Sequence, residues 1–156
     1  MTDLGDCRGC ALSDAMERRE FLRSLFAMGV VFVSGVGPRA DKSYPIPAAD
    51  GVAIDKEESV IIARHAGKLF AFSLACPHQN TALRWDARNN RFQCPKHRSR
   101  YQPDGVFIEG RATRGLDRFA VRRTEDSLLV NLDVLYQQDK NPAEWAAAFV
   151  PLGSEK

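Results

Sequence analysis

The sequence has little net charge and few cysteines, and each shortage excludes a class of function. A formal charge of +2 over 156 residues is too small to argue for nucleic-acid binding. The four cysteines are scattered, so they define no disulfide framework. Hydrophobic content of 44% and charged content of 27% are typical of a globular protein, and the length suits one domain with an additional segment.

The chain also lacks an uncharged run long enough to span a membrane comfortably. The run at residues 25–37 has thirteen residues, against the ~20 that a spanning helix needs. Counted from Phe21, with Arg23 reaching toward the headgroups, the segment has seventeen. It follows the pair Arg18-Arg19, and this arrangement resembles a twin-arginine export signal, although Glu17 stands where Ser or Thr is usual.

We therefore predict a polar N-terminal tail at 1–24 with a twin-arginine motif, and a hydrophobic helix at 25–37 retained as a membrane anchor. The alternative for 25–37 is a buried amphipathic helix, which its glycines disfavour. Residues 38–50, rich in proline, are predicted to be an extended linker or a loop along the domain surface.

Cys7 and Cys10 form a C-x-x-C motif in the predicted tail. No histidine follows them, which excludes covalent haem attachment. Two thiols in a flexible tail are favoured over a redox or metal-binding role, because an isolated C-x-x-C is a weak signal.

Two Cys-His pairs are the most informative feature of the sequence. Cys76-Pro77-His78 and Cys94-Pro95-Lys96-His97 are separated by the fifteen residues 79–93. Together they offer two thiolates and two imidazoles, the ligand set of a 2Fe–2S cluster with two Cys on one iron and two His on the other. A tetrahedral Cys₂His₂ zinc site uses the same four side chains and remains an alternative. The alternation of Cys and His along the chain favours the binuclear cluster.

The two motifs resemble those of the Rieske 2Fe–2S family, over about residues 58–132. The likeness extends to Ser99 and Tyr101, which follow the second motif at positions where high-potential members carry the same residues. It implies that Cys76 and Cys94 bind the inner iron, and that His78 and His97 bind the outer iron at the protein surface. It also implies that the two hydroxyls donate hydrogen bonds to a bridging sulfide and a cysteine sulfur, which raises the reduction potential.

The sequence departs from the cytochrome bc-type members of that family at three places. Thr81 and Lys96 occupy the positions of the cysteines that form a disulfide between the cluster loops of those members. Gln79 replaces an apolar residue, which makes the tip more polar. Their Gly-Pro-Ala-Pro loop corresponds to residues 110–113, with the sequence Gly-Arg-Ala-Thr. A place in a standard quinol oxidase complex is therefore open to question.

Several basic residues crowd the motifs, and two interpretations of them stay open. They could form an electropositive rim that steers an acidic partner, or only a solvated basic face. The residues are Lys96, Arg98, Arg100, Arg111 and Arg114.

The pattern around the motifs predicts a mainly β fold. Residues 59–64 and 68–73 flank His65-Ala66-Gly67 as a hairpin, so His65 is interpreted as a turn residue. Turns are predicted at 86–90 and 103–105, closing strands at 119–123 and 127–132, and a short helix after Asn141-Pro142. The predicted architecture is a Rieske-type fold of stacked antiparallel sheets at 51–135 with an inserted cluster-binding subdomain. Its cluster loops are 76–82 and 94–101, and a C-terminal extension follows at 136–156.

The leading hypothesis is a membrane-tethered, periplasm-facing one-electron carrier of a respiratory or photosynthetic chain, with no catalytic site of its own. Its partners would be other subunits of a membrane redox complex, a c-type cytochrome and possibly quinol. The alternatives are the small Rieske subunit of a molybdenum oxidoreductase such as arsenite oxidase, a soluble Rieske ferredoxin of an oxygenase system, and a zinc-binding interaction module. A complete Rieske oxygenase is excluded, because its mononuclear iron needs two further His and only His65 remains.

Overall fold

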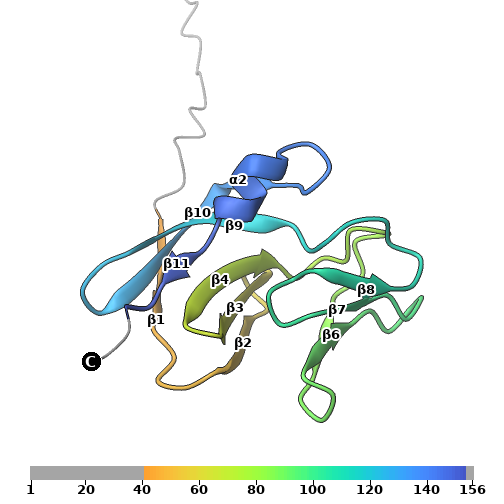
Figure 1. The fold of residues 1–156 in the computed structure, drawn as a ribbon, viewed down its shortest axis with the longest axis horizontal. Helices are drawn as coiled ribbons and strands as arrows, with labels where there is room; N and C mark the ends of the chain where they lie inside the picture. The colour runs from red at the N-terminus through yellow and green to blue at the C-terminus, as the bar shows by residue number, and fades with distance from the viewer. Residues whose placement is uncertain (1–40, 154–156) are drawn as a thin grey trace, which may run out of the picture. The chain divides into compact units, whose positions relative to one another are not determined.

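Two antiparallel sheets make up the part of the chain that the computed structural model describes, residues 41–153. The larger sheet has seven strands in the order β1-β10-β9-β4-β3-β2, with β11 paired to β4. The smaller sheet has the order β5-β6-β7-β8 (Figure 1). The elements are β1 (Lys42–Pro45), β2 (Gly51–Asp55), β3 (Val60–His65), β4 (Lys68–Ser73), β5 (Arg84–Asp86), β6 (Arg91–Gln93), β7 (Arg100–Tyr101), β8 (Phe107–Glu109), β9 (Arg118–Arg123), β10 (Ser127–Tyr136), α2 (Pro142–Ala147) and β11 (Val150–Pro151).

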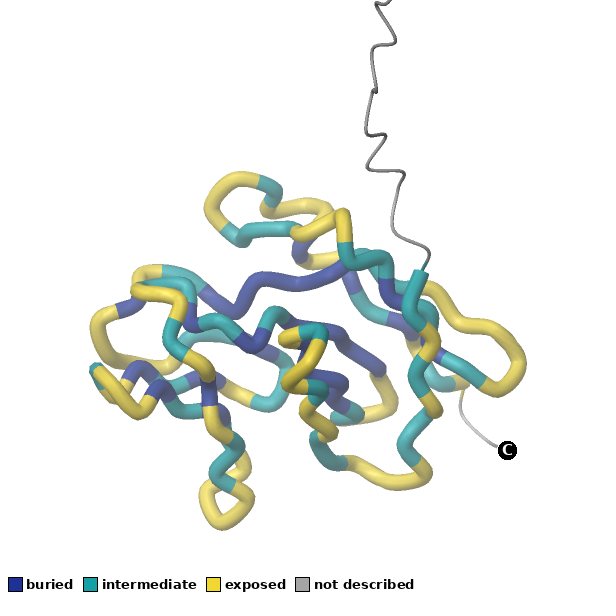
Figure 2. The backbone as a smooth tube through the Cα atoms, turned by 180° about the vertical axis from the view of Figure 1, so that it is seen from behind, coloured by how far each residue is buried: buried dark blue, intermediate teal, exposed yellow. Residues whose placement is uncertain are grey.

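The hairpin of β3 and β4 lies at the centre of the larger sheet, and its turn is set by local sequence. Ala66 and Gly67 both have positive φ, 49° and 70°, as a two-residue turn with the right-handed twist of a hairpin requires. The predicted hairpin is confirmed, with His65 as the last residue of β3 rather than in the turn. Both strands are buried along most of their length, as the dark central strands of Figure 2 show.

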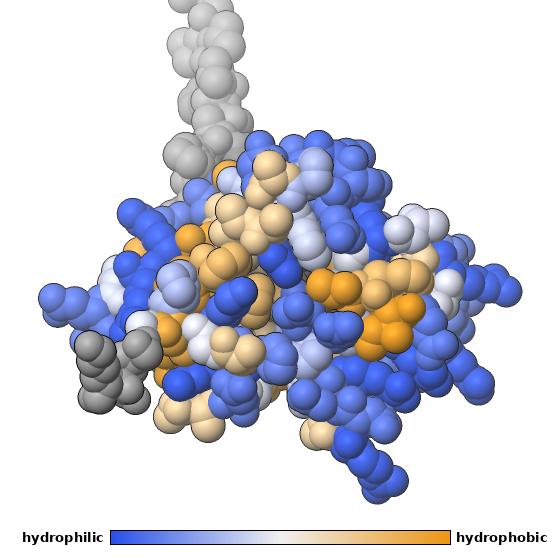
Figure 3. Space-filling model, in the orientation of Figure 1, coloured by the Kyte–Doolittle hydropathy of each residue, from blue (hydrophilic) through white to orange (hydrophobic). Residues whose placement is uncertain are grey.

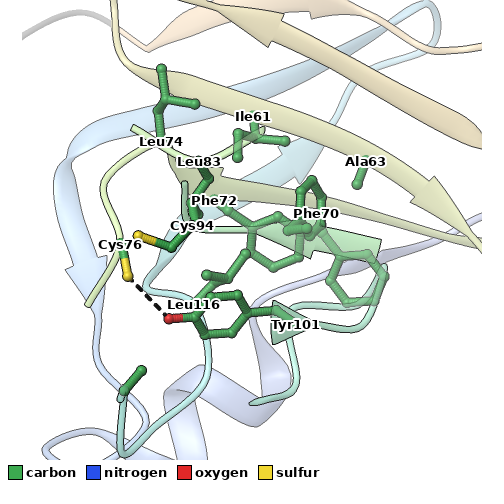
Figure 4. Close-up of a cluster of buried hydrophobic side chains, with 12 residues drawn as sticks. Ile61, Ala63, Phe70, Phe72, Leu74, Cys76, Leu83, Cys94, Tyr101 and Leu116 are labelled. Atoms are coloured by element: carbon green, nitrogen blue, oxygen red, sulfur yellow. Dashed lines mark hydrogen bonds between the residues drawn. The ribbon is translucent and has the colours of Figure 1, made fainter. Parts of the chain in front are cut away.

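Alternate residues of this hairpin supply two separate cores, because successive side chains of a strand point to opposite faces. Val60 and Ile62 pack with Leu128 and Val130 of β10 on one face. Ile61, on the other face, belongs to a second core that continues into the smaller sheet. This second core, drawn in Figure 4, contains Ile61, Ala63, Phe70, Phe72, Leu74, Cys76, Leu83, Phe92, Cys94, Tyr101, Ala112 and Leu116.

The smaller sheet is an insertion between two neighbouring strands of the larger one. The chain leaves the larger sheet at the end of β4 and returns to it at β9, and Phe72 pairs with Arg118 where these strands meet. Both motifs predicted to bind metal lie within the insertion, so the larger sheet acts as the base that supports them. The predicted stacked sheets with an inserted subdomain are confirmed. Ile108 in β8 is 46% exposed, and Figure 3 shows hydrophobic surface on the side where β7 and β8 lie.

Arg118 is a buried cation that joins the insertion to the C-terminal helix. Its guanidinium donates to the carbonyl oxygens of Trp145 at 2.8 Å and Asp104 at 2.6 Å, and lies 3.8 Å from the centre of the Trp145 ring. Burial lowers the pKa of Arg118 to about 10, so the group stays charged at neutral pH. The two carbonyls and the indole face replace the water that the charge has lost.

The termini of the domain are more closely tied to the sheet than the sequence suggested. Residues 42–45 of the predicted linker form β1, which pairs with β10 from Lys42↔Val130 to Pro45↔Ser127. These residues therefore belong to the sheet, because β10 offers them a free edge. The helix predicted after Asn141-Pro142 is present as α2, although the Asn141 side chain does not cap it.

The predicted polar tail, the twin-arginine motif, the hydrophobic helix at 25–37 and Cys7 and Cys10 lie outside the described residues. Within residues 41–153, no helix has the length and apolar character needed to cross a membrane.

Candidate metal centre

The first Cys-His motif forms a tight loop closed by two backbone hydrogen bonds. The N–H of Asn80 donates to the carbonyl of Cys76 at 2.8 Å, and the N–H of Cys76 donates to the carbonyl of Thr81 at 2.9 Å. Asn80 has a φ of 51°, in the left-handed region that asparagine tolerates better than most residues. His78 therefore lies within a loop whose two ends are joined by hydrogen bonds.

The second motif repeats the same backbone geometry. The N–H of Arg98 donates to the carbonyl of Cys94 at 3.0 Å, and the N–H of Cys94 donates to the carbonyl of Ser99 at 2.9 Å. The fifth residue again has a positive φ, 56° at Arg98. The two loops are therefore equivalent in backbone, although the histidine is the third residue of one and the fourth of the other.

The two cysteines lie next to each other in the interior. Cys76 is fully buried and Cys94 is 1% exposed, both are free thiols, and their sulfurs are neighbours in Figure 4. Burial opposes ionisation of Cys94. Hydrogen bonds from the backbone N–H groups of His97 and Lys96, and from the side chains of Cys76 and Thr81, outweigh it and lower the pKa of the thiol. The pocket thus favours a thiolate, the form that binds metal.

The two histidines form a second pair, closer to solvent. Nδ1 of His78 and Nδ1 of His97 are 3.1 Å apart, and both rings are half-buried. Two nitrogen ligands on one tetrahedral metal ion, each about 2.05 Å from it, are about 3.3 Å apart, so the observed separation fits a shared metal. Partial burial, followed by the positive charges of Arg111, His78 and Lys96, lowers the pKa of His97 and favours the neutral ring that coordinates metal.

The donors form two pairs rather than one group of four. Within residues 41–153, no three side chains of His, Cys, Asp or Glu converge closely enough to hold a single metal ion. A mononuclear Cys₂His₂ zinc site needs four donors around one point, whereas a binuclear cluster needs two donors at each of two irons. The buried pair of sulfurs and the half-buried pair of nitrogens match the two donors that a Rieske cluster takes at each iron. His65 lies elsewhere, lining a surface hollow with Arg64 and Trp85.

Tyr101 contacts the site from below. Its hydroxyl is 3.2 Å from the sulfur of Cys76 (Figure 4), and its ring is fully buried against Phe107. Desolvation, and then the hydrogen bond and charge of Cys76, raise the pKa of Tyr101. The phenol therefore keeps its proton and can donate it to the sulfur.

Ser99 is held in an orientation that leaves its proton available. Its Oγ accepts hydrogen bonds from the backbone N–H groups of Arg111 and Ala112, both at 3.1 Å. Because a hydroxyl oxygen has two lone pairs, these donors leave the O–H as its remaining hydrogen-bonding group. Ser99 is fully buried in the second loop, and its hydroxyl also lies within hydrogen-bonding reach of the Tyr101 hydroxyl.

Gly110 makes this arrangement possible, a role that was not predicted from the sequence. It has a φ of 118°, and a Cβ atom there would lie 2.4 Å from the Cα of Ser99. Only glycine allows the chain at 110–112 to approach Ser99 closely enough for two N–H groups to reach its oxygen. The glycine at the start of the 110–113 loop indicates a close approach of the backbone to another part of the chain. The sequence does not show that this part is Ser99, which lies eleven residues earlier.

Two of the five basic residues predicted around the motifs form ion pairs within the domain. Arg100 forms an ion pair with Glu109, and Arg114 forms ion pairs with Asp117 at 3.0 Å and Asp139 at 3.2 Å. Lys96, Arg98 and Arg111 are exposed, and among the described residues none of them has a carboxylate partner. The predicted rim of five residues is thus reduced to three unpaired cations.

Comparison with known families agrees with this site. The Rieske [2Fe-2S] domain family model matches residues 40–120. The chain therefore belongs to the Rieske family, and it carries a 2Fe–2S cluster bound by cysteine and histidine ligands.

Two relatives are iron-sulfur subunits of cytochrome b6-f complexes. The chain is 28% identical over 95 residues to the chloroplastic cytochrome b6-f complex iron-sulfur subunit of Bigelowiella natans, an alignment that spans 61% of this chain but only 32% of the relative. It is 26% identical over 128 residues to the cytochrome b6-f complex iron-sulfur subunit 1 of Synechocystis sp. strain PCC 6803, across 68% of this chain and 72% of the relative.

Two solved structures show weaker likeness. The plasma membrane Rieske protein PetC3 of Synechocystis PCC 6803 matches 51% of this chain and 82% of its own, with a TM-score of 0.43 and 23% identity. A chain of a hyperthermophilic respiratory Complex III matches 74% of this chain and 95% of its own, with a TM-score of 0.44 and 19% identity.

Proposed function

We propose that this protein transfers single electrons through a Rieske cluster held by Cys76 and Cys94 on one iron and His78 and His97 on the other. The observation that carries the proposal is the placement of four donors in two like pairs on two loops of the same backbone geometry. When bound, the cluster supplies a reversible one-electron redox centre.

The two pairs of ligands differ in burial. The cysteines are buried in the core, so the thiolate side is shielded from water. The histidines are half-buried and lie nearer the surface, which makes them the route by which an electron enters or leaves. The chain needs no further catalytic residue for this role.

We propose that the potential lies in the upper half of the Rieske range of about −150 to +300 mV. Tyr101 donates to the sulfur of Cys76, and Ser99 lies beside Tyr101 with its oxygen held by two backbone N–H groups. Hydrogen bonds to cluster sulfurs stabilise the reduced, more negative state and so raise the potential.

We propose further that the domain works on the periplasmic side of the cytoplasmic membrane, tethered by the segment after the arginine pair. The support is the pair Arg18-Arg19 followed by the uncharged run 25–37. Because an iron–sulfur cluster is inserted in the cytoplasm, a protein that uses it outside has to cross the membrane already folded, as the twin-arginine route allows. The named relatives are subunits of cytochrome b6-f complexes, which supports other subunits of a membrane redox complex as partners. A c-type cytochrome and possibly quinol are the further partners that we propose.

Purification of the full chain with iron and acid-labile sulfide analysis, together with EPR of the reduced protein, tests the ligand assignment. We expect two irons and two sulfides per chain and an axial or rhombic signal whose average g value is below 2. His97→Cys should keep a cluster and shift its spectrum, whereas Cys94→Ala should lose it. Full retention of the spectrum in Cys94→Ala, or one zinc ion per chain and no EPR signal, would reject the proposal.

Co-purification from native membranes tests the setting. Cytochrome subunits in the complex would support a role in quinol oxidation, and a large molybdenum-containing subunit would support the alternative oxidoreductase. Recovery of the protein only from the cytoplasmic fraction, with unchanged location in Arg18→Lys/Arg19→Lys, would contradict the export proposal.

A further inference from the structure

The surface around the half-buried histidine pair has an excess of positive charge that no described residue neutralises. Lys96 and Arg98 belong to the second cluster loop, and Arg111 follows the glycine that packs on this loop. All three side chains are exposed, and the positive charges of Lys96 and Arg111 act on His97. We call these three residues the cationic cap.

The cap differs from the other basic residues of the insertion. Arg100 and Arg114 have carboxylate partners within the domain, so their charges are largely cancelled at a distance. The cap residues have none among residues 41–153. A field that extends into solvent therefore comes from the cap, at the place where the electron enters or leaves.

Arg98 occupies a backbone position that favours other residues. It adopts a φ of 56°, a left-handed conformation that disfavours an ordinary side chain. The equivalent position of the first loop holds Asn80, which tolerates this conformation. The arginine therefore brings no local advantage to the backbone, and its side chain makes no ion pair with a described residue.

We propose that the cationic cap is a docking surface for an acidic electron-transfer protein, whose carboxylates surround its own exposed redox group. Lys96, Arg98 and Arg111 guide this protein to the histidine pair, and the electron passes between the two centres. The proposal rests on the electron-transfer function proposed above. A redox protein fits better than an anionic lipid surface, because Lys96 and Arg98 flank His97 in sequence, the charges of Lys96 and Arg111 act on it, and a lipid cannot take the electron.

Stopped-flow oxidation of the reduced full-length protein tests this surface. The oxidants are an acidic c-type cytochrome, a basic c-type cytochrome and ferricyanide, each over a range of ionic strength. At low salt, we expect the rate constant for the acidic cytochrome to be at least about tenfold larger than that for the basic cytochrome. The rate constant for the acidic cytochrome should fall as the salt concentration rises. The rate constant for the basic cytochrome should rise with salt.

The variant Arg98→Glu/Arg111→Glu reverses two charges of the cap and keeps the backbone N–H of residue 111. Its matched control is Lys56→Glu/Arg123→Glu, which makes the same change in net charge at two exposed positions, the turn between β2 and β3 and the end of β9. The ratio of the rate constants for the acidic and basic cytochromes is the readout, because a change in cluster potential affects both oxidants and largely cancels. The cap variant should lower this ratio about tenfold or more, and the control less than about twofold.

Each outcome has a distinct meaning. Equal ratios in the wild type and both variants would overturn the docking surface and leave the electron-transfer function intact, provided that all oxidants react. Failure of the reduced protein to react with any oxidant, ferricyanide included, would overturn the proposed function itself. Sedimentation with vesicles containing anionic lipid, lost in the cap variant while the ratio stays constant, would replace the protein partner with a membrane.

Discussion

The two cluster loops have the same backbone conformation but carry different side chains. Each runs for six residues, with the cysteine first, a positive φ at the fifth position and the cysteine N–H bonded to the sixth carbonyl. The first loop ends in Thr81 and contains no lysine or arginine. The second loop ends in Ser99, is followed by Tyr101, and carries two of the three cap cations.

This difference shows that holding the cluster and tuning it are separable. The backbone geometry, common to both loops, places the ligands. The tuning groups cluster on the second loop, because the chain at 110–112 packs against this loop and brings two N–H donors to Ser99. The two loops also depend on each other, since Tyr101 from the side of the second loop contacts Cys76 of the first.

The largest expected effect is that of Gly110→Ala, which breaks the support of the second loop. The new methyl group would meet the Cα of Ser99 at 2.4 Å, in a backbone conformation that disfavours side chains. We expect a loss of about 3 kcal/mol in the free energy of unfolding. Thermal denaturation of the cluster-loaded protein measures it.

Gly67→Ala is the matched control for this substitution. Gly67 also has a positive φ, but a Cβ there would meet nothing within 4 Å, so only the conformational cost of about 1 kcal/mol remains. Equal destabilisation by the two substitutions would show that the packing of residue 110 on Ser99 does not matter.

The next effect concerns the reduction potential and tests the asymmetry directly. Ser99→Ala and Tyr101→Phe should each lower the midpoint by about 40 mV, which corresponds to a hydrogen bond about 1 kcal/mol stronger in the reduced state. Thr81→Val, the matching change at the end of the first loop, should lower it less, because the Thr81 hydroxyl is the weakest of the influences on Cys94. EPR-monitored titration of the three variants checks the order, and a larger shift for Thr81→Val would reverse the assignment of tuning to the second loop.

Exchange of the fifth residues would show how far the loops are equivalent. Arg98→Asn should stabilise the protein by about 0.5–1 kcal/mol, and Asn80→Arg should destabilise it by a similar amount, because asparagine tolerates the left-handed conformation. Chemical denaturation measures both. A stability loss in Arg98→Asn would mean that the arginine makes a structural contribution that outweighs its backbone strain.

The smallest effect is expected at the hairpin that connects the two loops. Asp86 accepts hydrogen bonds from the Asn89 side chain at 2.7 Å and the Asn89 N–H at 3.3 Å. These bonds, chiefly the side-chain one, lower the pKa of Asp86 despite some desolvation, and Arg91 contributes as well. A depressed pKa in the folded state means that the stabilisation is present above the ordinary aspartate pKa of about 3.9 and is lost as the pH falls through the folded value.

The melting temperature of the wild type should thus fall more steeply below about pH 4 than that of Asp86→Asn. Asp126→Asn, in the exposed turn between β9 and β10, serves as the control and should follow the wild type. If the melting temperatures of the wild type and Asp86→Asn fell in parallel with pH, the Asp86 carboxylate would not contribute to the pH dependence of stability.

The sequence was most informative where the determinants are local. The β3–β4 hairpin followed from Gly67 and the flanking apolar strands, and the donor pairs followed from the spacing of Cys and His within each loop. Ser99 and Tyr101 were recognised through their offsets from His97. In each case the residues that decide the structure lie within a few positions of one another.

What depends on distant contacts could not be predicted. The role of Gly110 requires its approach to Ser99, and the pairing of β1 with β10 joins segments more than eighty residues apart. Arg118 has the sequence appearance of a surface arginine at the start of a strand, yet it is 4% exposed because Trp145 covers it. The reduction of the basic rim to three unpaired cations likewise depends on which carboxylates the fold brings close.

An EPR-monitored redox titration of the wild-type protein asks whether the hydroxyl groups of Ser99 and Tyr101 set the cluster to a high potential. We expect a single one-electron transition with a midpoint in the upper half of the range of about −150 to +300 mV. A midpoint well below 0 mV would contradict it.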